Sequence, residues 1–302
     1  MSTAIYSFPE LRQQAECLAR ELCCDCFPIS VRHFPDGESL ICIPETVTRA
    51  FVYRSLNHPN EKLVELVLAA ATLRSTGSSQ IILVAPYLAY MRQDIAFNQG
   101  EAVSQRIVGG LLSAYFDGVV TVDPHLHRTL SLGDVLPGKI AIPVSAAATL
   151  AALLGRDLPK NALLVGPDSE SRPWVENIAG ILDLEVLIGR KVRLGDRSVA
   201  IEISDVEHVS GRHVVLVDDV ISSGQTLIEC ARLCIASGAA HIEAVATHCL
   251  AGPDDLAAMK AGGIARIRTT DTIAGPTAEI SIAKAIAQAV RKQGIWLDDP
   301  HL

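Results

Sequence analysis

The chain has 302 residues, of which 49% are hydrophobic and 20% charged, so it can bury a large core and at this length usually forms two domains. Its formal net charge of -8 excludes a sequence-independent grip on nucleic acid, because such a grip needs basic surface to neutralise phosphates. An aromatic content of 4% also leaves few side chains on which bases could stack.

The first residues, MSTAIYSFPELRQQAE, have neither the basic start nor the apolar run of a signal peptide. The most apolar window, from Ile140 to Gly155, is too short for a bilayer span of ~20 residues and is predicted to form a packed helix. We therefore expect a cytoplasmic protein with neither a membrane nor nucleic acid among its partners.

Apolar strand-like runs alternate with helical patterns along the chain. The expected helices run from a cap at Asn60 to the residue before Gly77, from Thr226 to Ser237, where Gly238 ends it, and from Ser281 to Lys292. The expected strands are Ile81 to Ala85, Val119 to Val122, Ala162 to Val165, Val186 to Ile188, Val214 to Val217 and Ala244 to Ala246. This alternation predicts an α/β fold with mostly parallel sheets flanked by helices.

The two halves of the chain resemble each other. IILVAPY and VVTVDPH in the first half have counterparts in ALLVGPD and VVLVDDV in the second, and each run ends in polar residues. The carboxyl edge of a parallel sheet is where open α/β folds bind ligands. With a candidate linker at Gly133 to Lys139, we expect domains at 1–145 and 146–302, the last helix packing back on the first domain.

The eight cysteines are expected to be buried small hydrophobes rather than disulfides. Four of them gather at Cys17, Cys23, Cys24 and Cys26, but no second CxxC or HxxxH pair completes a zinc set.

The stretch Val214 to Thr226, VVLVDDVISSGQT, carries the strongest chemical signal. A buried strand presents Asp218 and Asp219, and Ser222 to Thr226 then open a helix. Free amides at a helix start favour an anion, and the carboxylates accept hydrogen bonds from sugar hydroxyls. The alternative is an ordinary strand-to-helix turn with an acidic cap. The chain contains neither GxxxxGK[ST] nor GxGxxG.

Four other stretches each have a functional and a plain interpretation. FPDGE, residues 34–38, is typical of a turn, and Arg92 with Gln93 suits phosphate or could form a surface ion pair with Asp94. His125 could cap a loop. Lys191 and Arg193 alternate along an extended segment near Arg190 and Arg197, so they form either an arm over an anion or a solvated charged hairpin.

VVLVDDVISSGQT resembles the ribose-phosphate loop of type I phosphoribosyltransferases and of phosphoribosyl diphosphate (PRPP) synthetases. HFPDGES, YMRQDIAFNQGEAVS, VDPHLH, VGPDSES and Lys191-Val192-Arg193 favour the synthetase, with AVATHCL and TTDTI further along. The spacing resembles the archaeal-like branch. Ser222 and the bulkier Gln225 depart from the family pattern.

The resemblance implies two tandem type I phosphoribosyltransferase-like domains and a set of site residues. Lys191 and Arg193 would be catalytic, in an arm that closes over ATP. The implied ATP-binding residues are Phe34, Asp36, Glu38, Arg92, Gln93 and His125. The implied ribose 5-phosphate ligands are Asp218, Asp219, Ser222, Ser223, Gly224 and Thr226. Asp168 and, less directly, His125 would contact Mg²⁺, because magnesium prefers oxygen ligands.

The implied reaction is diphosphate transfer from Mg-ATP to ribose 5-phosphate. Phe34 would stack on adenine and Asp36 and Glu38 contact it from a neighbouring subunit, so a homo-oligomer with ATP at a subunit interface is expected. Two alternatives stay open: a phosphoribosyltransferase that consumes PRPP, and a non-catalytic subunit that keeps the synthetase fold.

Overall fold

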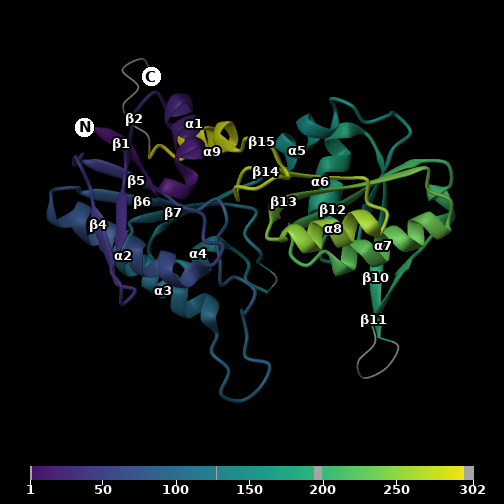
Figure 1. Ribbon diagram of the computed structural model, residues 1–302, viewed down its shortest axis with the longest axis horizontal. Coiled ribbons are helices and arrows are strands. Elements are labelled where there is room, and N and C mark those ends of the chain that lie inside the picture. The colour runs from purple at the N-terminus through teal and green to yellow at the C-terminus, as the bar shows by residue number, and fades with distance from the viewer. Residues whose placement is uncertain (1, 127, 194–198, 296–302) are drawn as a thin grey trace. The chain divides into compact units, whose positions relative to one another are not determined.

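The computed structural model describes residues 2–126, 128–193 and 199–295, and it divides into two compact units (Figure 1). Unit 1 joins Met1–Ser145 with the segment that begins at Ser281, and unit 2 is Ala146–Ile280. Unit 2 is therefore inserted between two parts of unit 1.

Unit 1 is built on a sheet of six parallel strands in the order β2-β1-β5-β6-β7-β8. The strands are β1 (Thr3–Ser7), β2 (Asp25–Pro28), β5 (Arg49–Tyr53), β6 (Gln80–Val84), β7 (Gly118–Val122) and β8 (Ile140–Val144). An antiparallel hairpin, β3 (Ser30–His33) and β4 (Ser39–Cys42), forms a separate small sheet. The helical elements are η1 (Pro9–Leu11), α1 (Arg12–Leu22), α2 (Pro59–Ser75), α3 (Ser104–Tyr115), α4 (Leu132–Val135) and α9 (Ala283–Lys292).

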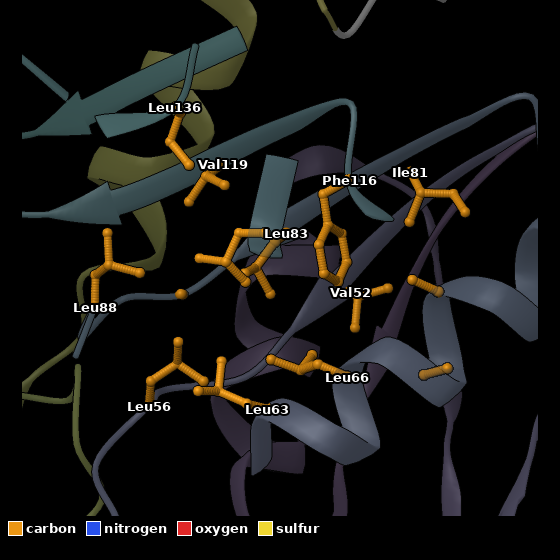
Figure 2. Packing of buried hydrophobic residues seen from close by; sticks show 14 of the residues in the cluster. Val52, Leu56, Leu63, Leu66, Ile81, Leu83, Leu88, Phe116, Val119 and Leu136 are labelled. Carbon is orange, nitrogen blue, oxygen red and sulfur yellow. The ribbon is translucent and has the colours of Figure 1, made fainter. Parts of the chain in front are cut away.

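Apolar strand residues are buried on both faces of this sheet, because helices cover each face. Figure 2 shows one of these packed layers, where Leu63 and Leu66 of α2 approach Val52 and Leu83 of the sheet. Leu66 is fully buried, so truncating it to alanine is expected to cost about 2–5 kcal/mol of stability. Helices α1 and α9 contact each other and the strands of the same unit.

Unit 2 has a sheet of seven strands in the order β11-β10-β9-β12-β13-β14-β15, parallel except for the β10–β11 pair. The strands are β9 (Leu163–Gly166), β10 (Glu185–Arg193), β11 (Val199–Ile203), β12 (His213–Ile221), β13 (His241–Cys249), β14 (Arg266–Thr270) and β15 (Ala278–Ile280). The helical elements are α5 (Ala147–Leu154), α6 (Arg172–Leu182), η2 (Val206–Val209), α7 (Gln225–Ala236) and α8 (Pro253–Ala261). Leu227 and Ile228 of α7 and Met259 of α8 join one buried cluster with β9, β12 and β13.

The α/β class with mostly parallel, helix-covered sheets is confirmed, and each strand expected from the sequence lies in one of the two large sheets. The helix expected from Ile140 to Gly155 is wrong, because its first part is β8, the edge strand beside β7, and only Ala147–Leu154 is helical. The expected linker at Gly133 to Lys139 overlaps α4 and leads into β8, so it lies within unit 1.

Two smaller expectations are also corrected. Helix α2 begins at Pro59 with His58 at the N-cap, so Asn60 lies in the first turn, where its side chain accepts a hydrogen bond from the Tyr90 hydroxyl. Of the cysteines, Cys230 and Cys234 are buried, whereas Cys23 and Cys42 are exposed. None of the helices in the described part of the chain is long and apolar enough to cross a membrane.

Candidate active site

The carboxyl edge of the unit 2 sheet gathers three carboxylates predicted as site residues. Asp168 follows β9, and Asp218 and Asp219 lie in the neighbouring parallel strand β12. The sequence suggested that β12 ends before these carboxylates, but the strand continues to Ile221, which pairs with Cys249 of β13. The carboxylates are therefore held by strand backbone that extends beyond the end of β9.

The environment of Asp218 opposes its ionisation. Desolvation by burial is the main cause, and the nearby carboxylates of Asp219 and Asp168 add to it, so the pKa of Asp218 lies well above its ordinary value. The amide of Asp219 donates to Asp218 Oδ1 at 2.9 Å, and the Asp219 side chain is buried. A cluster that resists further negative charge is suited to a cation or to hydroxyl donors.

Asp168 is fixed by the turn that leads from β9 into α6. Its Oδ1 accepts hydrogen bonds from the amides of Glu170 at 3.0 Å and Ser171 at 3.2 Å, while the Ser171 hydroxyl donates to the Asp168 carbonyl at 2.6 Å. These bonds orient the carboxylate without a bulky neighbour. They explain why a Ser sits three residues after this Asp.

The loop after β12 has the geometry of an anion-binding helix start. Ser222 and Ser223 are exposed, and Gly224 has φ +73° and is followed directly by α7. A Cβ at Gly224 would collide with the side chain of Met259, so both the backbone conformation and the close approach of α8 require glycine. Gln225 lies along the surface of α7, where its amide donates to Glu229 Oε1 at 3.3 Å. The larger side chain of Gln225 therefore does not cover the backbone amides of the Ser222 to Gly224 loop.

Beyond the same edge, β10 and β11 form an antiparallel hairpin. Lys191 pairs with Ile201 and Arg193 with Val199 through their backbones. The side chains of Lys191 and Arg193 lie outside the described part of the structure, as do residues 194–198 with Arg197. Gly189, where β10 leaves β9, lets the backbone approach the Pro167 carbonyl, since a Cβ there would lie 2.5 Å from that oxygen.

In unit 1, three predicted ATP ligands follow neighbouring strands. Arg92 and Gln93 lie in the loop after β6, and His125 follows β7, so all three belong to the carboxyl edge of that sheet. Arg92 is exposed, and Gln93 donates to the Ile95 carbonyl at 3.0 Å. His127 lies outside the described residues.

Asp94 has a different partner from the one considered for it. Its carboxylate pairs with Arg128, 2.9 Å from Nη1, and also accepts the Arg128 amide at 3.1 Å. Burial alone would raise the pKa of Asp94, but the hydrogen bonds from Arg128 outweigh it and lower the pKa. Asp94 is therefore a buried carboxylate paired with Arg128 rather than a surface partner for Arg92, which is itself exposed.

The FPDGE stretch is the turn of the β3–β4 hairpin. Gly37 donates its amide to the Phe34 carbonyl at 2.9 Å, and Phe34 donates to the Glu38 carbonyl at 2.8 Å. Phe34, Asp36 and Glu38 are all exposed, and the Arg32 guanidinium lies 4.9 Å from the Phe34 ring centroid. The turn expected from Pro-Asp-Gly is confirmed, and it presents an aromatic ring and two carboxylates together.

Sequence reasoning missed Glu65, a charged residue in the middle of α2. Its side chain is buried and binds His33 and Ser39 of the hairpin and Arg54 after β5. The available signal was its spacing, because Glu65 lies four residues before Ala69 on the face that α2 buries. A carboxylate on the buried side of a helix needs a partner, which predicts a network.

The donor chemistry of Asp168, Asp218 and Asp219 suits a hard divalent cation, because magnesium takes oxygen ligands and keeps several waters. Within residues 2–126, 128–193 and 199–295, no group of three or more His, Cys, Asp or Glu side chains forms a complete metal cage. That arrangement is compatible with an ion held by one or two carboxylates together with substrate phosphates.

Each unit has a largely parallel α/β sheet with polar loops at its carboxyl edge, and the class of the chain is that of the phosphoribosyltransferases. Residues 144–291 match the model of a phosphoribosyl transferase domain, and residues 3–115 match the N-terminal domain of ribose phosphate pyrophosphokinase. The chain is 36% identical to a ribose-phosphate pyrophosphokinase of Methanopyrus kandleri, over 90% of this chain and 93% of that protein. It is 30% identical to a ribose-phosphate pyrophosphokinase of Methanobrevibacter smithii, over 91% of this chain and 95% of that protein.

The chain belongs to the ribose-phosphate pyrophosphokinase family. A phosphoribosylpyrophosphate synthetase structure from Mycobacterium smegmatis superposes with a TM-score of 0.82 at 25% identity, covering 98% of this chain and 99% of that one. The expected family is confirmed, and the two named relatives agree with the archaeal-like spacing.

Proposed function

We propose that the chain transfers the diphosphate group of Mg-ATP to O1 of ribose 5-phosphate, giving PRPP and AMP. The observation that carries the proposal is the carboxyl edge of unit 2, where buried carboxylates precede a serine and glycine loop at the start of α7. Family membership across nearly the whole chain supports it, since the named relatives are ribose-phosphate pyrophosphokinases.

Ribose 5-phosphate would bind entirely to unit 2. The ribose hydroxyls donate to Asp218 and Asp219, and these bonds offset the crowding of negative charge that raises the Asp218 pKa. The 5-phosphate lies on the loop of Ser222, Ser223, Gly224 and Thr226, against the free amides at the start of α7. The sugar is then fixed at both ends, which holds O1 in one place.

ATP would be held by Arg92, Gln93 and His125 through its phosphates and ribose, and by Phe34, Asp36 and Glu38 of a neighbouring subunit at adenine. The exposed Phe34 ring supports this role, because a ring on a protruding turn is available to stack on a base. In unit 2, Asp168 would hold Mg²⁺. When bound, that ion offsets charge on the phosphates and orients the transferred group.

The transfer is an in-line displacement. The hydroxyl oxygen at O1 forms a bond to the β-phosphorus while the bond from that phosphorus to the α,β-bridging oxygen breaks. AMP leaves with the electron pair, and the O1 proton passes to solvent. Lys191 and Arg193, carried beyond the sheet edge by β10, would offset the charge on the transferred group.

A homo-oligomer is part of the proposal because the adenine site borrows a hairpin. Helix α3 exposes Ile107, Leu111 and Tyr115 at successive turns, and the adjacent α2 exposes Val64 and Leu68. Exposed apolar side chains on two helices in contact support a protein interface here. Light scattering is expected to find an oligomer, and an active monomer would contradict this part.

The experiment that tests the function is incubation of the purified chain with ATP, Mg²⁺ and ribose 5-phosphate. AMP and PRPP in equal amounts are the expected products. A chain that instead consumed PRPP with a base would be a phosphoribosyltransferase, and a chain that produced no AMP at any phosphate concentration would be the non-catalytic subunit.

A further inference from the structure

The β3–β4 hairpin has little structure of its own to hold it in position. It is a separate two-stranded sheet of four residues per strand, and two-stranded hairpins in water are marginally stable. Every residue of its turn, from Phe34 to Glu38, is exposed. Val31 and Ile41, which pair across the strands, supply apolar packing against the unit 1 core. The turn itself needs another anchor.

Glu65 of α2 provides a polar anchor at the base of that turn. Its Oε1 lies 2.9 Å from His33 Nε2 and accepts the Ser39 hydroxyl at 2.8 Å. His33 and Ser39 are opposite each other in the strand register and are the last residues before the turn on either side. An ionised carboxylate can only accept, so His33 Nε2 carries the hydrogen. One oxygen atom therefore binds both strands.

The other oxygen of Glu65 ties the hairpin to the carboxyl edge of the sheet. Oε2 lies 2.6 Å from Arg54 Nη2, and Arg54 is buried directly after β5. Arg54 in turn binds Glu10 at 2.8 Å and stacks on Phe8, 3.7 Å from the ring centroid. These bonds keep Glu65 charged, since together they outweigh the burial that would raise its pKa. Arg54 also compensates the buried charge if the hairpin donors are lost.

We propose that Glu65 is a positioning residue for adenine recognition: by binding His33 and Ser39 it fixes the Phe34 to Glu38 turn, and so sets the affinity for ATP without affecting ribose 5-phosphate. This inference rests on the proposed function, in which that turn contacts adenine. Glu65 binds His33, Ser39 and Arg54 and is not one of the residues proposed to contact a substrate. Its effect is transmitted through the two hairpin residues that it holds.

The test is a double variant, His33→Phe with Ser39→Ala, which removes both hairpin donors and leaves the Glu65–Arg54 ion pair intact. A roughly tenfold rise in KM for ATP is expected, with kcat and KM for ribose 5-phosphate unchanged. The pair His33→Gln with Ser39→Thr retains both donors and is expected to restore the KM for ATP. Arg12→Ala, which breaks an exposed ion pair with Glu16 in the same unit, is the control.

Two results would overturn the inference. One is an unchanged KM for ATP in the double variant. The other is a fall in kcat with an equal rise in the KM values for both substrates, or dissociation of the oligomer. Either result would mean that Glu65 only stabilises the fold or the assembly. Failure of the proposed function is distinguishable, since the unmodified chain would then produce no AMP in the same assay.

Discussion

Replacing Asp218 with asparagine is expected to stabilise the free protein while abolishing its binding of ribose 5-phosphate. The carboxylate of Asp218 is desolvated and lies near those of Asp219 and Asp168, so its charge is unfavourable in the folded state. Two like charges several ångströms apart at an effective dielectric constant of ~20 repel by about 1–3 kcal/mol. The asparagine side chain keeps the shape, and its amide oxygen can still accept the Asp219 backbone N–H.

The stabilisation must depend on pH in a fixed direction. The folded-state pKa of Asp218 is raised above its unfolded value of ~3.9, so the folded state binds the proton more tightly. The associated stability is complete below the unfolded pKa and is lost as pH rises through the folded pKa. The asparagine that replaces Asp218 has no proton to lose. The variant and the parent should therefore be equally stable in acid, with a gap that opens as pH rises.

Thermal unfolding across pH 4 to 9, without substrates or Mg²⁺, measures this gap. About 2 kcal/mol corresponds to a rise in Tm of ~4–8 °C for a unit of this size. Calorimetry with ribose 5-phosphate follows the expected loss of binding. A stability difference that is constant with pH, or a variant less stable than its parent at pH 8, would show that the ionised Asp218 carboxylate does not destabilise the folded state.

Three further predictions concern the loop, the β10 hairpin and the β3–β4 turn. Gly224→Ala should lower the free energy of unfolding by about 1–3 kcal/mol and weaken ribose 5-phosphate binding, because the added Cβ would collide with Met259 at a positive φ. The control, Gly180→Ala, places a Cβ in open space on α6 and should leave stability unchanged or raise it. Equal denaturation midpoints for the two variants would contradict this prediction. Lys191→Ala should reduce kcat by ~10² to 10³, while calorimetry should still detect binding of ribose 5-phosphate to the variant. Arg190→Ala is the control, and near-normal AMP release by Lys191→Ala would remove Lys191 from the mechanism. Phe34→Ala should raise KM for ATP several-fold relative to Leu40→Ala on the same hairpin.

Most of the fold could be predicted because buried parallel strands have short, continuous apolar runs in the sequence. Val214 to Val217 and Ile81 to Ala85 are such runs, and both are central strands. Strands such as β1 and β5 were not identified, since TAIYS and RAFVY mix polar and aromatic residues. Helix assignment failed at Ile140 because an apolar run of this length fits a strand and a helix equally well, and only pairing with β7 decides.

The site was partly predictable for a related reason. Asp168 follows β9, and Asp218 and Asp219 lie near the carboxyl end of the neighbouring parallel strand β12, so parallel topology alone brings them to one edge. Glu65 acts through partners 26 and 32 residues away, and pairings of that separation leave no local pattern. Likewise Asp94 has its partner at Arg128, 34 residues on, rather than beside it.

The insertion of unit 2 within unit 1 has a consequence for biosynthesis. Helix α9 buries Ile286, Ala287 and Val290 and packs on α1, and Arg291 donates a hydrogen bond to the Glu21 carbonyl. Unit 1 therefore lacks one of its covering helices until the ribosome has made all of unit 2. During that interval the face of α1 that packs on α9 is exposed, so unit 2 can fold first, and unit 1 is completed only when α9 emerges.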